Sequence, residues 1–181
     1  MKKIAVLFSG DGSNLKFILE NLHNINLNVV VAITNNPYAK GISFCKEYNI
    51  PYFIYNSKEI KREELDKLIV KKINEYNVDL TVLAGYMRIL TPFFVNNIRA
   101  INLHPSFLPN HKGLNAIENS YYDNNLYGGV SVHYVSEELD NGNIVYQEKI
   151  FKKNLSLEEY IEEVKFKEKI ILKKAILFLI I

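Results

Sequence analysis

Short apolar runs and segments of helical periodicity alternate along the first half of the chain. The apolar runs predict strands over residues 4–8, 28–33, 51–55 and 78–84. Between them, apolar side chains recur every three or four positions, which predicts helices over residues 15–22, 42–48 and 65–76. Strands that alternate with helices form parallel sheets whose faces the helices cover. The pattern therefore predicts an α/β fold with an open, mostly parallel, twisted sheet and helices on both faces.

The second half of the chain continues with further strands and a long helix. Strands are predicted over residues 100–103, 129–135 and 144–151, a short helix over 114–122, and a charged turn over 136–143. Ser156 and Glu159 form a capping-box pair ahead of a helical pattern that continues through Ala175. Residues 175–181 are all apolar, but a membrane span needs about 20 such residues. We therefore expect them to form the core-facing end of the helix.

Composition limits the domain number, the partners and the location. A chain of 181 residues with 48% hydrophobic residues suits one sizeable core, so we expect a single domain over residues 1–181. The 22 basic and 20 acidic residues are scattered, which argues against a nucleic-acid partner. The single cysteine, Cys45, has aromatic neighbours and is expected to be a buried thiol, which favours a reducing, cytoplasmic setting. The first apolar run lacks the length and flanks of a signal peptide.

A glycine-containing turn, residues 9–14, joins the first predicted strand to the first predicted helix. Its glycines allow backbone N–H groups to point at an anion, and the positive end of the helix favours a phosphate. A purely structural bend explains the turn equally well, because glycine suits any tight turn. Leu15 stands where a dinucleotide fingerprint has its third glycine, and residues 30–36 hold no acidic residue for a ribose hydroxyl. Nicotinamide binding is therefore disfavoured.

Asn102 and His104 lie two residues apart at the end of a predicted strand, immediately before Pro105. Alternation along a strand places both side chains on the same side. The amide of Asn102 can donate to a developing oxyanion, and His104 can carry a proton near neutral pH. When His104 is considered alone, a purely structural role is as well supported as a catalytic one. Asp140 follows a later strand and is a candidate partner for His104, although an ordinary turn carboxylate is the better explanation from spacing alone.

The other candidate positions have simpler structural explanations. His133 is expected to pack within its strand, and His111 to be solvated on its loop. With one cysteine and no metal-ligand spacing, no metal site is predicted. The apolar segment 85–90 is expected to be a core crossover with an exposed Arg88, and a site for a flat heteroaromatic ligand is the minority alternative.

Four motifs connect these observations to a known family. They are residues 8–15 (FSGDGSNL), 83–90 (LAGYMRIL), 102–109 (NLHPSFLP) with Gly113, and 129–140, which begins GVSVHYV and ends ELD. In order and spacing they resemble the folate-dependent formyltransferases over most of the chain. The resemblance implies a Rossmann-like formyltransferase fold. It also implies transfer of a formyl group from 10-formyltetrahydrofolate, the co-substrate, to the amine of glycinamide ribonucleotide, with neither metal nor nicotinamide.

The resemblance also assigns roles to individual residues. Asn102, His104 and Asp140 match the catalytic residues of the family. The phosphate end of the substrate is assigned to Gly12, Ser13 and Asn14, and a further substrate contact to Glu168. The folate is assigned to Arg62, Met87, Arg88, Ile89, Leu90, Asn102, Glu137, Glu138, Leu139 and Asp140. Lys169 and the pair Leu172 and Lys173 depart from the His and Tyr-Pro that the family usually has.

Related activities remain alternatives. The same Asn-x-His core resembles formyl-folate hydrolases and formyltransferases that act on another amine, such as methionyl-tRNA. Those relatives are expected to carry an added domain, which this sequence does not show. A noncatalytic folate-binding or nucleotide-binding module is the alternative from a different class. We expect small-molecule substrates, no nucleic acid, no membrane, and a monomer or homodimer.

Overall fold

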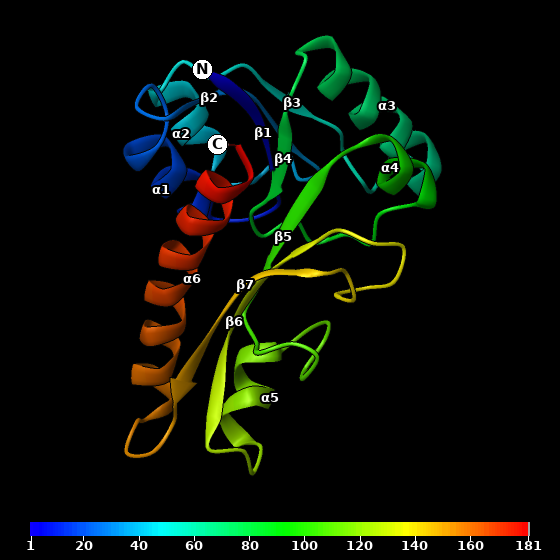
Figure 1. Cartoon of the computed structure of the whole chain (residues 1–181). Helices are drawn as coiled ribbons and strands as arrows, with labels where there is room; N and C mark the ends of the chain where they lie inside the picture. The colour runs from blue at the N-terminus through cyan, green and yellow to red at the C-terminus, as the bar shows by residue number, and fades with distance from the viewer. Residues whose placement is uncertain (181) are drawn as a thin grey trace. The chain divides into compact units, whose positions relative to one another are not determined.

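The computed structural model of the chain describes residues 1–180 (Figure 1). Within these residues the strands are β1 (Lys2–Phe8), β2 (Leu27–Thr34), β3 (Tyr52–Ile54), β4 (Leu80–Leu83), β5 (Ala100–His104), β6 (Tyr127–Tyr134) and β7 (Ile144–Phe151). The helices are α1 (Ser13–Asn21), α2 (Ile42–Glu47), α3 (Arg62–Glu75), α4 (Pro92–Asn97), α5 (Ala116–Tyr122) and α6 (Leu157–Ile180). Every predicted strand and helix is present, and α4 is an addition.

The strands form one sheet in the order β3-β2-β1-β4-β5-β6-β7. β1 pairs in parallel with β2 and β4, and β2 pairs in parallel with β3. β6 and β7 form an antiparallel pair. The predicted α/β fold with an open, mostly parallel sheet is therefore confirmed.

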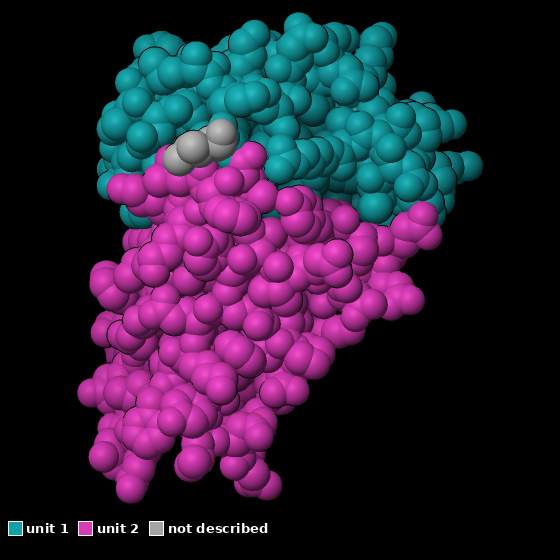
Figure 2. All heavy atoms as spheres, in the orientation of Figure 1, with its two compact units in different colours: residues 1–101, 180 teal, residues 102–179, 181 magenta. Residues whose placement is uncertain are grey.

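The described chain divides into two compact units, which Figure 2 colours separately. Unit 1 is Met1–Ile101 with Ile180, and unit 2 is Asn102–Leu179. The boundary falls inside β5, so the polar end of that strand belongs to unit 2.

Unit 1 is built around β1, whose residues 4–8 are fully buried. A strand with neighbours on both sides and helices over both faces has no solvent-facing side, which explains its unbroken apolar run. Figure 1 shows α1 and α2 on one side of these strands and α3 and α4 on the other. Cys45 in α2 is the expected buried thiol, and burial raises its pKa to about 11.

Helix α4 is not predicted from the sequence, because its six residues make fewer than two helical turns and show no clear periodicity. Its start signals are nevertheless present, since Pro92 is the first helical residue and Thr91 caps the helix by accepting from Phe94 N–H. The N–H of Thr91 donates to Asp66 Oδ2 at 2.7 Å. Asp66 is thereby a buried carboxylate on α3, which periodicity alone does not reveal.

In unit 2 the long helix α6 begins as predicted. Ser156 N–H donates to Glu159 Oε2 at 2.7 Å, and Glu159 N–H donates to Ser156 Oγ at 3.2 Å, which is a complete capping box. Near its other end Ile176 is buried, but Phe178 is 66% exposed. The expectation of a core-facing end thus holds for only part of the segment, and Ile181 lies outside the described residues. No helix within residues 1–180 is long and apolar enough to cross a membrane.

Candidate active site

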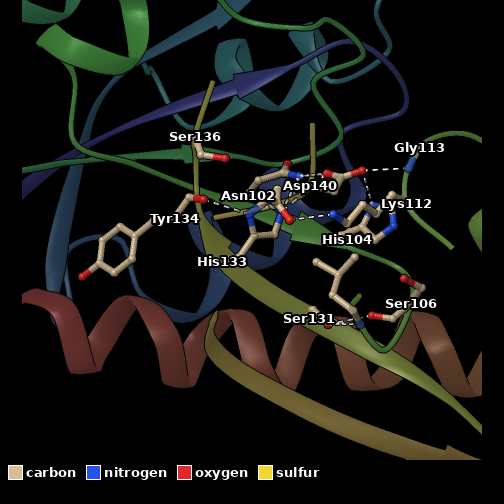
Figure 3. Close-up of polar contacts among 12 residues, drawn as sticks. Asn102, His104, Ser106, Lys112, Gly113, Ser131, His133, Tyr134, Ser136 and Asp140 are labelled. Atoms are coloured by element: carbon tan, nitrogen blue, oxygen red, sulfur yellow. Dashed lines mark hydrogen bonds and ion pairs between the residues drawn. The ribbon is translucent and has the colours of Figure 1, made fainter. Parts of the chain in front are cut away.

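The carboxyl end of β5 carries a buried polar cluster in unit 2 (Figure 3). Asp140 Oδ2 lies 3.4 Å from His104 Nδ1, and Asp140 Oδ1 accepts from Asn102 Nδ2 at 3.2 Å. The side chains of His104 and Asp140 are 6% and 5% exposed. Alternation along β5 brings Asn102 and His104 to the same carboxylate, as the spacing predicts. Asp140 is therefore a buried partner of both residues and no solvated turn carboxylate.

Both ring nitrogens of His104 face an acceptor. Nε2 lies 2.8 Å from the backbone carbonyl oxygen of His111, whereas Nδ1 faces Asp140 at the longer distance of 3.4 Å. A carbonyl oxygen can only accept, so Nε2 carries a hydrogen in this geometry. The longer Nδ1 contact is the weaker of the two, so breaking it in favour of another partner costs less free energy.

Asp140 is held in its ionised form. Burial by itself would raise its pKa, but the hydrogen bond to His133, the backbone N–H of Gly113 at 2.9 Å and the charge of His104 outweigh burial. The pKa of Asp140 therefore lies below its ordinary value. A carboxylate that stays charged while buried can orient an imidazole and hold a proton donor against a reacting group.

His133 in β6 is a fourth member of the cluster, which the sequence did not indicate. Its Nε2 lies 3.2 Å from Asn102 Nδ2 and 3.5 Å from Asp140 Oδ1, and its Nδ1 lies 2.8 Å from the carbonyl oxygen of Tyr134. The carbonyl requires a hydrogen on Nδ1. Nε2 then accepts from Asn102 when the ring is neutral and donates to Asp140 when it is charged. His133 is buried within its strand as expected, but it also orients the amide of Asn102.

The prediction that His111 is solvated is wrong. Its Nε2 lies 2.5 Å from Asp123 Oδ2, and its side chain is 22% exposed. Asp123 is the C-cap of α5, so the contact forms only when the loop after β5 folds back on that helix. No local sequence signal connects the two residues.

In unit 1 the predicted glycine turn leads into α1. Gly12 caps the helix with φ 76°, a conformation that favours glycine. A Cβ atom there would lie 2.5 Å from Cα of Gly41, so close approach of two backbones imposes the same requirement. A cleft of about 320 Å³ is lined by residues 9–14 with Ala84, Gly85 and Met87. The turn is therefore shaped around a cleft and is more than a bend.

The segment after β4 departs from the predicted core crossover. Met87 and Ile89 are 64% and 50% exposed, so their apolar side chains face outward. Arg88 is half-buried and donates from Nη1 to the carbonyl oxygen of Ser57 at 3.3 Å, so it is not the exposed residue expected. Met87 N–H donates to Ser9 Oγ at 2.8 Å, which ties this segment to the turn over residues 9–14. Exposed apolar side chains beside a polar turn are typical of a small-molecule site.

The remaining candidate residues divide between the two units. Gly12, Ser13, Asn14, Arg62 and residues 87–90 lie in unit 1, and Asn102, His104, residues 137–140 and Glu168 lie in unit 2. Leu90 is buried, whereas Arg62, at the start of α3, and Glu137, Glu138 and Leu139 are exposed. Glu168 lies half-buried in α6. Among the side chains of residues 1–180, no group of three or more His, Cys, Asp or Glu is arranged to hold a metal ion.

Known proteins match both the sequence and the fold. The formyl transferase family matches residues 2–176. The chain belongs to the formyl transferase family. A phosphoribosylglycinamide formyltransferase from Haemophilus influenzae is 39% identical over 91% of this chain and 78% of its own. The human trifunctional purine biosynthetic protein adenosine-3 is 36% identical over 82% of this chain, which corresponds to 15% of that longer protein.

Solved structures support the same membership. The crystal structure of phosphoribosylglycinamide formyltransferase from Campylobacter jejuni has 47% identity and a TM-score of 0.94, covering 97% of this chain and 95% of that chain. The corresponding structure from Bacillus halodurans has 31% identity and a TM-score of 0.91, covering 98% and 95%. The formyl transferase match thus includes both the glycine turn of unit 1 and the β5 cluster of unit 2.

Proposed function

We propose that this protein transfers the formyl group of 10-formyltetrahydrofolate to the amine of 5-phosphoribosylglycinamide, a step of purine biosynthesis. The observation that carries the proposal is the meeting of Asn102, His104 and the ionised Asp140 at the end of β5. Two N–H donors that share one carboxylate are suited to stabilise the formyl oxygen, which becomes an oxyanion when the formyl carbon is attacked. The similarity to phosphoribosylglycinamide formyltransferases supports this choice of substrate.

The proposed reaction needs no covalent enzyme intermediate. The substrate amine attacks the formyl carbon, the new C–N bond forms, the bond from that carbon to the folate nitrogen breaks, and the proton lost by the amine ends on the folate nitrogen. Asn102 and, when the ring is charged, the Nδ1–H of His104 stabilise the oxyanion. Their contacts to Asp140, at 3.2 and 3.4 Å, are longer than the roughly 2.7–2.9 Å of a strong charge-assisted hydrogen bond. Exchanging them for the oxyanion therefore costs little.

Asp140 has two roles in this proposal. Its carboxylate orients His104, and through a bound water it accepts and returns the proton of the amine. Because the backbone N–H of Gly113 also donates to the carboxylate, at 2.9 Å, the carboxylate stays in place while the proton moves.

We assign the substrate contacts to the binding residues that the family resemblance implies. Gly12, Ser13 and Asn14 hold the phosphate, supported by the cleft at the turn and by the N-terminal end of α1. The folate is assigned to Arg62, Met87, Arg88, Ile89, Leu90, Asn102 and residues 137–140, supported by the exposed apolar side chains of Met87, Ile89 and Leu139. Glu168 contacts the glycinamide substrate in this assignment.

The wider setting forms part of the proposal. Residues 1–181 work as one formyltransferase domain on small-molecule substrates, in the cytoplasm, as a monomer or homodimer. Neither nucleic acid, metal nor nicotinamide is required.

A folate-release assay tests the function. Release of tetrahydrofolate from 10-formyltetrahydrofolate is followed by absorbance, with and without glycinamide ribonucleotide. We expect release that depends on the amine. Release independent of the amine would make the protein a formyl-folate hydrolase, release that depends on a different amine would change the acceptor, and tight folate binding without release would leave a binding module.

A further inference from the structure

Unit 2 contains a buried charged network besides the proposed catalytic cluster, and it begins at Lys152. The side chain of Lys152 is 8% exposed, and its Nζ lies 2.5 Å from Asp123 Oδ1. The same ammonium donates to the carbonyl oxygen of Ser120 at 2.5 Å. Burying an ammonium is costly unless it is paired and hydrogen-bonded, so this arrangement fixes Asp123 firmly at the end of α5.

The fixed carboxylate of Asp123 in turn holds the side chain of His111. Burial would raise the pKa of Asp123, but hydrogen bonds from Lys152 and His111 hold it well below its ordinary value. The ionised carboxylate can only accept, so His111 Nε2 donates to Oδ2 across 2.5 Å. The imidazole of His111 is therefore held by a charged, immobile acceptor.

The backbone of His111 is strained. Its φ is 55°, in the left-handed region that residues with a Cβ seldom adopt. Such a conformation is unfavourable and persists where the surroundings impose it. In this conformation the His111 carbonyl oxygen lies 2.8 Å from Nε2 of His104. One residue thus has its side chain fixed to Asp123 and its carbonyl fixed to His104.

We infer that His111 is a positioning residue for His104, and that Lys152 and Asp123 act through it. The carbonyl keeps a hydrogen on Nε2 whether the ring is neutral or charged. Proton gain and loss are therefore confined to Nδ1, the nitrogen that faces Asp140. The role of Nδ1 in formyl transfer rests on the proposed function, whereas the position of the hydrogen in the free protein does not.

Nuclear magnetic resonance tests the position of the hydrogen directly. Long-range ¹H–¹⁵N spectra distinguish the two neutral tautomers of a histidine, and the chain has four histidines, which single substitutions assign. In the wild-type protein we expect the neutral His104 to carry its hydrogen on Nε2. In His111→Gly, which relieves the strain at this φ and removes the side-chain anchor, we expect a mixture of the two tautomers.

Kinetics on the same variants test the consequence for catalysis. His111→Gly should lower kcat about tenfold and change KM by less than about twofold, because misplacing a catalytic group costs rate more than binding. His111→Gln places an amide N–H near the position of Nε2 and keeps the same strained backbone, so it should restore both kcat and the single tautomer. Lys112→Ala is the matched control, since Lys112 is the next residue but contacts Asn141.

The outcomes separate this inference from the proposed function. A single Nε2–H tautomer in His111→Gly overturns the inference even if kcat falls, because the loss would then be structural. Failure of His111→Gln to restore kcat and tautomer in a protein that melts like wild type also overturns it. If the wild-type protein shows no formyl transfer, the proposed function is refuted. The tautomer spectra do not depend on that activity, so they still test the role of His111.

Discussion

Asp140 combines burial with charge, and this combination determines its behaviour at the residue scale. Asn102 reaches it from 38 positions away in sequence, and Gly113 N–H donates to it from the loop after β5. These donors replace the water that the carboxylate loses on burial. The group is therefore fixed and ionised before any substrate binds, which is the condition for electrostatic catalysis without reorganisation.

Replacing Asp140 with Asn keeps the size of the side chain and removes its charge. We expect Asp140→Asn to lower kcat by about 100-fold, as loss of a preorganised electrostatic contact typically does. KM for both substrates should stay close to wild type. Steady-state kinetics measure both quantities. A rise in KM at unchanged kcat would make Asp140 a ligand contact rather than a catalytic residue.

The lowered pKa of Asp140 also predicts how stability depends on pH. A carboxyl whose pKa is lower in the folded state stabilises the fold fully above its unfolded pKa, about 4, and loses this contribution as pH falls through the folded value. Wild-type protein should therefore lose more stability between pH 7 and pH 3 than Asp140→Asn does. Urea unfolding of both proteins at several pH values measures the difference. Parallel curves for the two proteins would contradict the prediction.

At the scale of elements, the turn from β1 to α1 shows why a glycine pattern predicts a site. Gly10 and Gly12 look alike in the sequence, yet only Gly12 has both a positive φ and a close backbone neighbour. The requirement comes from Gly41 at the start of α2, which lies far along the chain. The turn and the start of α2 thus pack directly against each other.

The two glycines provide a matched pair of variants. Gly12→Ala should destabilise the protein by at least about 1 kcal/mol, because it adds the cost of a left-handed residue to a steric overlap. It should also raise KM for glycinamide ribonucleotide, since the turn must shift. The added Cβ of Gly10→Ala meets nothing within 4 Å, so this variant should keep the stability of wild type. Thermal melts and kinetics compare the two, and equal effects would show that the turn tolerates a Cβ at both positions.

The accuracy of the sequence predictions follows the range of the interactions involved. β1 and α6 were predictable, because a fully buried strand must be apolar and a capping box is local. α4 was missed because it is too short for periodicity. The roles of His133 and His111 were missed because their partners, Asn102 and Asp123, meet them only after folding. Asp140 was assigned through the family motif, since its spacing also fitted an ordinary turn.

At the scale of the whole molecule, the residues proposed to hold the substrate phosphate and the residues proposed to act on the formyl group belong to different compact units. The phosphate turn lies in unit 1, and Asn102, His104 and Asp140 lie in unit 2. Each unit can therefore respond to its own ligand contacts, and hydrogen exchange can follow them separately.

We expect saturating glycinamide ribonucleotide to slow amide hydrogen exchange within residues 9–16, because its phosphate would be held by the N–H groups of residues 12–14. Glycinamide without the ribose phosphate is the control and should leave that segment unchanged. Exchange measured by mass spectrometry reports both. Equal protection by the two ligands would remove the phosphate from this turn.

The two ends of the sheet bear on self-association in concentrated solution. An unpaired strand edge is a template onto which another chain can add. One end of this sheet is β3, only three residues long, and the other is β7, which includes the charged Glu148 and Lys149. A short edge and a charged edge both discourage strand addition between copies. Pairing of two copies through either edge is thus disfavoured.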